Sequence, residues 1–146
     1  MSEELVGVLY AEDDPDDRLL AREAWEDSRA LNPLDFVEDG EELLEYLRRE
    51  GRHAGRTGAQ PGVILLDLNM PRMDGRAALA EIKKDPELRR IPVVVLTTSK
   101  ASEDVLKSYD LGVAGFIVKP PTFEALTNVL RKVDEYWLKL VRLPAP

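Results

Sequence analysis

The chain has 146 residues, a formal net charge of −8 and no cysteine. This length suits one domain with one hydrophobic core, and the 44% of residues that are hydrophobic can fill it. The acidic balance argues against binding to a nucleic acid backbone, and the lack of cysteine excludes a disulfide framework or a thiolate metal site. No apolar run is long enough to cross a bilayer, and no basic segment precedes the first apolar stretch. We therefore expect a cytoplasmic protein that contacts neither membrane nor nucleic acid.

Five short runs of branched and apolar residues alternate with segments of helical spacing. The third and fourth runs, "VILLD" and "VVVLT", are almost wholly apolar, which is typical of strands buried on both faces of a parallel sheet. Strand and helix alternate five times, and this order predicts an α/β fold, a doubly wound parallel sheet with helices on both faces. The predicted strands are residues 5–11, 34–38, 63–67, 93–97 and 114–118.

The first predicted helix begins in a crowded acidic stretch, "EDDPDD". Asp14 is expected to cap the helix, with Pro15 at its first position. Asp16 and Asp17 would lie in the first turn, where negative charge favours the positive end of the helix dipole. We interpret both as solvated capping residues. The apolar stripe that we expect to face the sheet is formed by Leu19, Leu20, Ala24 and Trp25.

Polar side chains stand where four of the predicted strands end. They are Glu12 and Asp13 after the first strand, Asp67 after the third, Thr97 at the fourth and Lys119 after the fifth. Because the carboxyl ends of parallel strands meet at one edge of a sheet, these side chains should converge there. Oxygen ligands suit a hard cation such as Mg²⁺, and a lone lysine beside them suits a phosphoryl oxygen or a carboxylate.

These residues belong to a set of motifs that resembles the receiver domains of two-component response regulators. The set comprises the acidic pair "ED", the stretch "VILLDLNMPRMDG", the threonine of "VVVLTT" and the Lys-Pro of "FIVKPP". The motifs occur in order, and the resemblance covers essentially the full chain. It implies a flavodoxin-like sheet with strand order 2-1-3-4-5, and a phosphoacceptor protein of signal transduction with Mg²⁺ as its cofactor.

The resemblance also assigns roles to individual residues. Asp67 would be the phosphoacceptor, whose carboxylate attacks the phosphorus of a phosphohistidine on a partner sensor histidine kinase. Asp13 and Asp67 would bind Mg²⁺ directly, Glu12 would act through a water, and the backbone carbonyl of Asn69 would be a further ligand. Lys119 would pair with the phosphoryl oxygens.

Two residues would carry the phosphorylation signal to the surface. Thr97 would donate its hydroxyl once the phosphoryl group is present, and Phe116 stands where the family keeps its switch aromatic. Their movement would remodel the face made by the fourth helix, the fifth strand and the fifth helix, as a shift of a pre-existing equilibrium. The resemblance further implies a cis peptide bond between Lys119 and Pro120.

We expect one receiver domain spanning residues 1–146. Two of its segments favour a narrower group of response regulators. Residues 51–62 lengthen a loop that is glycine-rich and basic, which we expect to be mobile and to carry His53 as a surface residue. Apolar spacing also continues past the usual end of the last helix, through a tail of about residues 133–146. The chain is similar to the stand-alone regulators of phytochrome-type histidine kinases, which commonly form homodimers.

The tail could pack against its own core or against a second copy of the chain, and we favour the second copy because exposed apolar patches mark interfaces. The predicted interface residues are Tyr136, Trp137, Leu140 and Val141.

Two other readings of the acidic site stay open. An aspartate-nucleophile phosphatase would need a second carboxylate two residues after the nucleophile, where this chain has Asn69. A phosphorylation-independent binding module would keep the fold without the chemistry, although Asp67 and Lys119 are both present here. We do not expect an enzyme that acts on other substrates. The protein would catalyse only its own phosphorylation and dephosphorylation. Small polar side chains at Asn69 and Ser99 leave room for water, which predicts a labile phosphoryl group.

Overall fold

Alternating strands and helices build a parallel sheet in the computed structural model, which describes residues 6–140 and 142–144. The strand order is β2-β1-β3-β4-β5, and every neighbouring pair is parallel, so the expected flavodoxin-like topology is confirmed. Each strand lies within one of the predicted runs. The strands are β1 (Val8–Ala11), β2 (Leu34–Val37), β3 (Val63–Leu66), β4 (Val93–Thr97) and β5 (Gly115–Val118).

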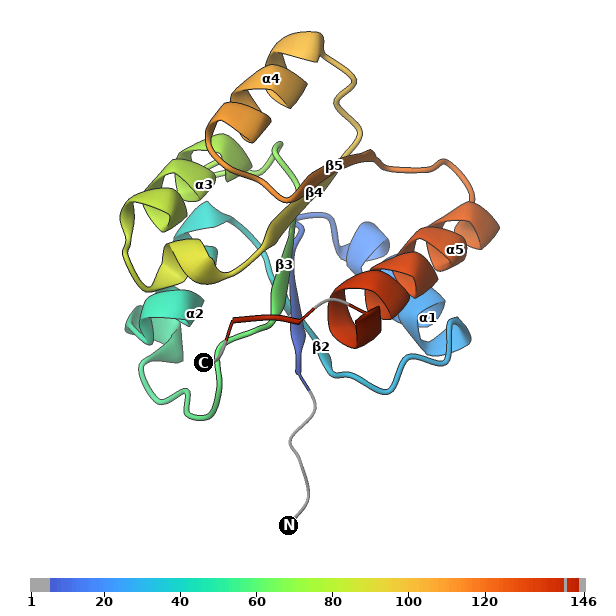
Figure 1. Ribbon diagram of the computed structural model, residues 1–146, viewed down its shortest axis with the longest axis horizontal. Coiled ribbons are helices and arrows are strands. Elements are labelled where there is room, and N and C mark those ends of the chain that lie inside the picture. The colour runs from blue at the N-terminus through green and yellow to red at the C-terminus, as the bar shows by residue number, and fades with distance from the viewer. Residues whose placement is uncertain (1–5, 141, 145–146) are drawn as a thin grey trace.

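Helices cover both faces of this sheet. In Figure 1, α1 and α5 lie on one side, and α2, α3 and α4 lie on the other. None of the helices in the described part of the chain is both long and apolar enough to span a bilayer. Their bounds are α1 (Pro15–Asp27), α2 (Gly40–Arg48), α3 (Gly75–Lys84), α4 (Ser102–Asp110) and α5 (Phe123–Val133), with short 3₁₀ turns at Gly51–His53 and Leu88–Arg90.

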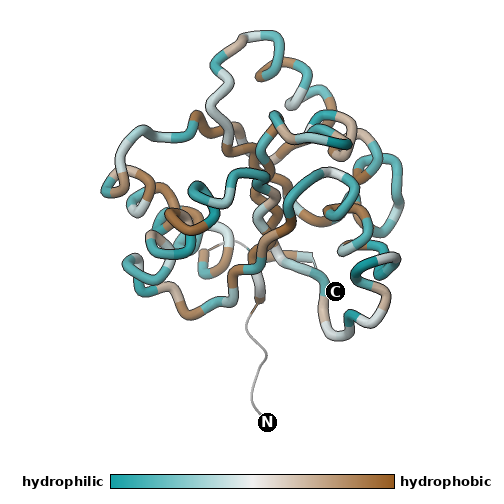
Figure 2. The backbone as a smooth tube through the Cα atoms, turned by 180° about the vertical axis from the view of Figure 1, so that it is seen from behind, coloured by the Kyte–Doolittle hydropathy of each residue, from teal (hydrophilic) through white to brown (hydrophobic). Residues whose placement is uncertain are grey.

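The central strand β3 is buried on both faces and divides the core into two clusters. Ile64 and Leu66 pack in the cluster under α2 and α3, whereas Val63 and Leu65 pack in the cluster under α1 and α5. Figure 2 shows the same pattern, with hydrophobic strands at the centre and hydrophilic stretches on the outer helices. This two-sided burial explains why the run has no polar alternation.

The buried face of α1 differs in part from the predicted apolar stripe. Leu19 and Leu20 are exposed, at 57% and 37%, so the prediction that they face the sheet is wrong. Ala24 and Trp25, the other two members of the predicted stripe, are buried as expected, and Ala21 is buried with them. These three share a face at helical spacing, and two small alanines let the helix lie close to the strands. The predicted cap is confirmed, since the Asp14 carboxylate accepts hydrogen bonds from the amides of Asp16 and Asp17.

The loop before β3, expected to be mobile because of its glycines, is fastened to α2 by its basic residues. The Arg56 side chain donates to the Tyr46 carbonyl at 2.9 Å, and its guanidinium stacks 4.0 Å from the centre of the Tyr46 ring. Gln60 donates to the Leu47 carbonyl at 2.6 Å. His53 is only partly exposed, with Nε2 at 2.9 Å from a Glu42 oxygen. The basic side chains of this loop therefore hold it against α2.

The last helix continues beyond α5 as a π-helical segment, Asp134–Leu140. Trp137 is half-buried and packs against the core under α1 and α5, which agrees with the reading that the tail folds back. Tyr136 and Leu140 are exposed, at 49% and 73%, and so are free to contact another surface. Val141 lies outside the described residues.

The two ends of the described chain meet at the amino edge of the sheet. A Cβ atom placed on Gly62 would lie 2.0 Å from Val6 Cγ1 and 2.8 Å from Leu143 Cδ1. A larger residue here would displace the side chains of Val6 and Leu143. The edge at which they meet lies opposite the carboxyl ends of the strands.

The expected cis bond between Lys119 and Pro120 is wrong, because every peptide bond among the described residues is trans. A trans bond before proline is favoured by about 0.5–1 kcal/mol in the absence of other constraints. The Lys119 amide still donates to the Thr97 carbonyl at 2.7 Å, so the backbone stays paired with β4 up to the lysine.

Candidate functional site

The carboxyl edge of the sheet gathers the polar residues predicted for it. Glu12 follows β1, Asp67 follows β3, Thr97 is the last residue of β4 and Lys119 follows β5. Parallel register places these strand ends side by side, with Ala11 beside Leu66 and Thr97 beside Val118. The geometry expected from strand order alone is therefore present.

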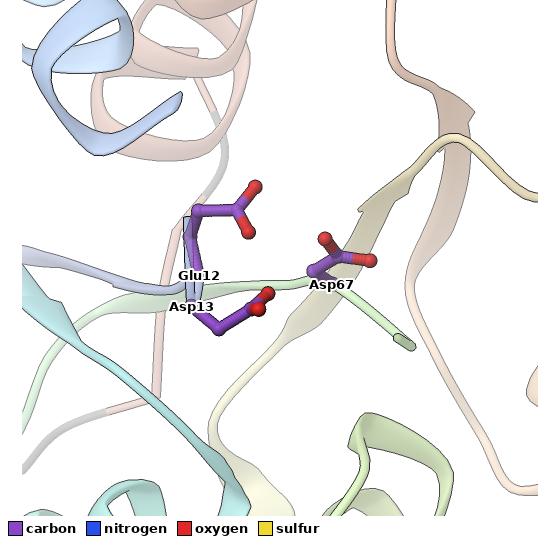
Figure 3. A group of neighbouring side chains, drawn as sticks. All are labelled: Glu12, Asp13 and Asp67. Carbon is purple, nitrogen blue, oxygen red and sulfur yellow. The ribbon is translucent and has the colours of Figure 1, made fainter. Parts of the chain in front are cut away.

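Three carboxylates lie close together at the strand ends, as Figure 3 shows. One oxygen from each of Glu12, Asp13 and Asp67 lies within 4.8 Å of the other two. Glu12 and Asp67 are buried, whereas Asp13 is the more exposed of the three. Arg18 holds the backbone beneath them, because its Nη1 donates to the carbonyls of Glu12 and Asp13 at 2.9 and 2.8 Å.

The Lys119 ammonium lies among acceptors that match its three N–H donors. It contacts Glu12 Oε1 closely, Asp17 Oδ2 at 3.3 Å and Asp67 Oδ2 at 3.6 Å. Its side chain is 11% exposed. The lysine thus links the phosphoacceptor candidate to the acidic pair and to the first turn of α1.

Burial and charge pull the ionisation of this group in opposite directions. Burial raises the pKa of Glu12 to about 7, although the hydrogen bond from Lys119 opposes the rise. Burial alone would lower the pKa of Lys119, but the acidic groups around it outweigh burial and raise that pKa. The lysine therefore stays charged near neutral pH, while Glu12 exchanges its proton there.

Thr97 and Asn69 contact the same carboxylate oxygen. The fully buried Thr97 hydroxyl donates to Asp67 Oδ1 at 2.8 Å, and the Asn69 amide donates to it at 3.1 Å. The threonine thus engages the carboxylate itself in this structure. Phe116 is the second residue of β5 and lies half-buried against the core under α2 and α3.

Two contributors were missed at the sequence level. Asp17 was interpreted as a solvated capping residue, yet it accepts from Lys119, which is 102 residues away along the chain. Arg18 was assigned no role. Neither contact can be recognised from a sequence pattern, because both depend on where the first turn of α1 lies relative to the strand ends. His53 contacts Glu42 of α2 and is not part of the polar cluster at the strand ends.

Comparison with known proteins agrees with this fold and site. The family model for the response regulator receiver domain matches residues 8–131. The chain therefore belongs to the response regulator receiver domain family.

Several relatives are similar over nearly the whole chain. The response regulator Rcp1 of Synechocystis sp. is 39% identical over 138 residues, which cover 94% of this chain and 92% of Rcp1. The crystal structure of the phosphorylated cyanobacterial phytochrome response regulator RcpA has a TM-score of 0.88 and 42% identity, covering 97% of this chain and 99% of RcpA. The crystal structure of Mn²⁺-bound Rcp1 has a TM-score of 0.86 and 38% identity, covering 96% of this chain and 99% of that one.

Proposed function

We propose that this chain is a one-domain response regulator that accepts a phosphoryl group on Asp67. The observation that carries the proposal is the convergence on one carboxylate of the Thr97 hydroxyl, the Lys119 ammonium and two further acids. A carboxylate with a purely structural role would not require this set of contacts. The family membership and the likeness to RcpA and Rcp1 support the same function.

In the proposed reaction, a carboxylate oxygen of Asp67 attacks the phosphorus of a phosphohistidine. A new O–P bond forms, the P–N bond breaks, and the electron pair of that bond returns to the imidazole nitrogen of the donor. Lys119 and Thr97 donate hydrogen bonds to the charge on the transferred oxygens. In dephosphorylation, water attacks the phosphorus, the O–P bond to Asp67 breaks, and inorganic phosphate leaves with the Asp67 carboxylate restored.

The acidic residues fit a resident divalent cation. Their donors are all carboxylate oxygens, the set that Mg²⁺ prefers, and crowded negative charge here is offset by one lysine. Asp13 and Asp67 would hold the ion, with Glu12 acting through water and the Asn69 carbonyl as a further ligand. The ion would neutralise charge as the phosphoryl group approaches the carboxylate.

We assign a sensor histidine kinase of phytochrome type as the donor, and the cytoplasm as the place of the encounter. Support comes from the names of the relatives, since RcpA is described as a phytochrome response regulator. In this proposal Thr97 and Phe116 pass the signal to the face of α4, β5 and α5. The exposed Leu106, Tyr109 and Val118 on that face give it an apolar surface.

The test is the intact mass of the protein after incubation with phosphoramidate and Mg²⁺, for the wild type and for Asp67→Asn. The expected result is one added phosphoryl group on the wild type alone, which is lost when Mg²⁺ is chelated beforehand. A wild type that stays unmodified would favour a binding module without phosphorylation. Continuous release of phosphate from small phosphate esters would instead favour a phosphatase.

We also infer a homodimer formed through α5 and its π-helical extension. Tyr136 and Leu140 support it, because large apolar side chains this exposed favour burial against a partner. Trp137 contributes less than expected from the sequence, since it packs partly on its own core. Light scattering at micromolar concentration should report a dimer that Leu140→Glu dissociates. A monomer at that concentration would contradict the inference.

A further inference from the structure

A ring of five hydrogen bonds, closed by the peptide bond between Asp67 and Leu68, connects α4 to the phosphoacceptor. It starts at Arg76 on α3 and Asp104 on α4, passes through the loop after β4 and returns to the backbone after β3. Its members, in order, are Arg76, Asp104, Ser99, Thr97, Asp67 and Leu68.

The strongest link in the ring is the pair of Arg76 and Asp104. The guanidinium donates through Nε to Asp104 Oδ1 at 2.8 Å and through Nη2 to Asp104 Oδ2 at 2.7 Å. This bidentate geometry fixes both planes relative to each other. Hydrogen bonds from Arg76 and Ser99 lower the pKa of Asp104 to about 2, so the carboxylate is ionised at any physiological pH.

The remaining links reach the Asp67 carboxylate through Thr97 and the neighbouring backbone through Leu68. Ser99 Oγ donates to Asp104 Oδ2 at 2.6 Å, and the Ser99 amide is 3.4 Å from Thr97 Oγ1. Thr97 then donates to Asp67 Oδ1 at 2.8 Å. On the other side, Arg76 Nη1 donates at 3.3 Å to the carbonyl of Leu68, the residue after Asp67. The orientation of the Thr97 hydroxyl therefore depends on where Asp104 holds the loop.

The position of α4 depends on the same pair, because the helix has little apolar anchoring. Among its residues, all of which the structure describes, Ser108 is the one that is buried. Its N-cap position is Ala101, which makes no side-chain cap. Leu106 and Tyr109 face outward. A helix held so weakly by packing is placed chiefly by its polar contacts.

We propose that Arg76 and Asp104 are positioning residues for phosphoryl transfer, which hold Ser99 and, through it, the hydroxyl of Thr97 against the phosphoacceptor. The inference rests on the proposed function and adds two residues to it. Neither residue touches the transferred group. Their effect is on the direction of the Thr97 donor.

The test compares initial rates of phosphoryl uptake from phosphoramidate at saturating Mg²⁺, followed by intact mass. Asp104→Ala and Arg76→Gln should each slow uptake by about tenfold, the effect of misdirecting one hydrogen-bond donor. Mg²⁺ affinity, measured by calorimetry, should stay unchanged in both. Glu103→Gln, which removes an equal charge from an exposed site in the same turn of α4, should keep the wild-type rate.

A double-mutant cycle separates positioning from general loosening of the fold. In a Thr97→Ala background, Asp104→Ala should cause no further slowing, because the donor it orients is gone. Ser99→Thr keeps the hydroxyl and should retain most of the rate, whereas Ser99→Ala should match Asp104→Ala. This serine pair carries the test if Asp104→Ala fails to fold.

Four results would overturn the inference. They are a wild-type rate for Asp104→Ala, full additivity with Thr97→Ala, a loss of Mg²⁺ affinity that accounts for the slower uptake, and equal rates for Ser99→Ala and Ser99→Thr. A wild-type chain that takes up no phosphoryl group at all would overturn the proposed function as well. Uptake by the wild type with unaffected variants would overturn the inference alone.

Discussion

Glu12 is the side chain whose chemistry depends most on its surroundings. It is 1% exposed, it touches the Lys119 ammonium, and burial raises its pKa to about 7. A carboxylic acid must lose its proton before it can serve as a cation ligand, even through a water. Proton and cation therefore compete at this residue within the range of physiological pH.

We predict that Mg²⁺ binds more tightly as the pH rises through about 7. Below that value, each unit of acidification should weaken binding by up to about tenfold, because Glu12 is then protonated while Lys119 keeps its charge. Above it, affinity should level off. Calorimetric titration from pH 6 to pH 8.5 measures the trend. Glu12→Gln should bind more weakly with a flat profile, and an unchanged slope in that variant would show that another group titrates.

The loop between β3 and α3 is the element that links the site to the rest of the fold. It carries Asn69, and its far end is held by the start of α2. The Gly40 amide donates to the Met73 carbonyl at 2.8 Å, and a Cβ on Gly40 would lie 2.1 Å from that oxygen. Asp39, fully buried, accepts from Arg72 at 2.8 Å and also caps α2 through the Glu42 amide at 2.8 Å.

Asp39→Ala should destabilise the protein by about 2 kcal/mol, chiefly because it removes the α2 cap and leaves the Glu42 amide without its acceptor. Since Arg72 is 57% exposed, the ion pair itself should contribute only a small part. Urea denaturation measures the difference. Asp39→Asn should lose less, as its side-chain oxygen still caps α2, and Glu41→Gln in the same turn should be neutral. Equal losses for Asn and Ala would contradict the capping argument.

The pH dependence of this element has a definite sign. Burial would raise the pKa of Asp39, but the Glu42 amide and Arg72 outweigh it and lower that pKa. A carboxyl with a lowered pKa in the folded state stabilises above its ordinary pKa of about 3.9, and that contribution disappears as the pH falls below it. The Asp39→Asn variant should therefore lose less stability on acidification than the wild type does.

Across the whole molecule, negative charge is concentrated at one edge of an already acidic chain. The net charge is −8, and three carboxylates of the site lie within 4.8 Å of one another. Their repulsion opposes folding, and a cation bound only by the folded state offsets it. Stability should therefore depend on the divalent ion supplied.

We predict that saturating Mg²⁺ raises the thermal midpoint of unfolding. At a free concentration of about 100 times its dissociation constant, a ligand of the native state adds about 2.7 kcal/mol. Asp13→Asn should remove most of this gain while folding normally, because Asp13 is the exposed member of the cluster. Scanning calorimetry with Mg²⁺, and with Na⁺ at matched ionic strength, distinguishes a specific site from screening. An equal rise with Na⁺ would argue for screening.

The strand ends were predictable because parallel topology alone brings them together. Asp67, Thr97 and Lys119 are each marked by an apolar run that stops at a polar residue. The face of α1 was not predictable in this way, since a helix one step rotated leaves Leu19 exposed and buries Ala21 with equal periodicity. The pairing of Arg76 with Asp104 was out of reach for a different reason. The two residues are 28 apart and depend on how α3 lies beside α4.

Residues near the two ends of the described chain meet at Gly62, and this arrangement bears on circular permutation of the fold. A Cβ on Gly62 would meet both Val6 and Leu143 at the edge opposite Asp67, so a short peptide could join residue 6 to residue 143 without passing the carboxyl ends of the strands. A Cβ on Gly55 would meet nothing within 4 Å, so this residue is the place in the loop to open the circle, provided that Arg56 keeps its contacts with Tyr46. Opening the chain there would cut the connection from α2 to β3 and leave the other three strand-helix-strand crossovers of the sheet intact. We therefore expect such a permutant to keep the carboxylate cluster of Glu12, Asp13 and Asp67 at the opposite edge.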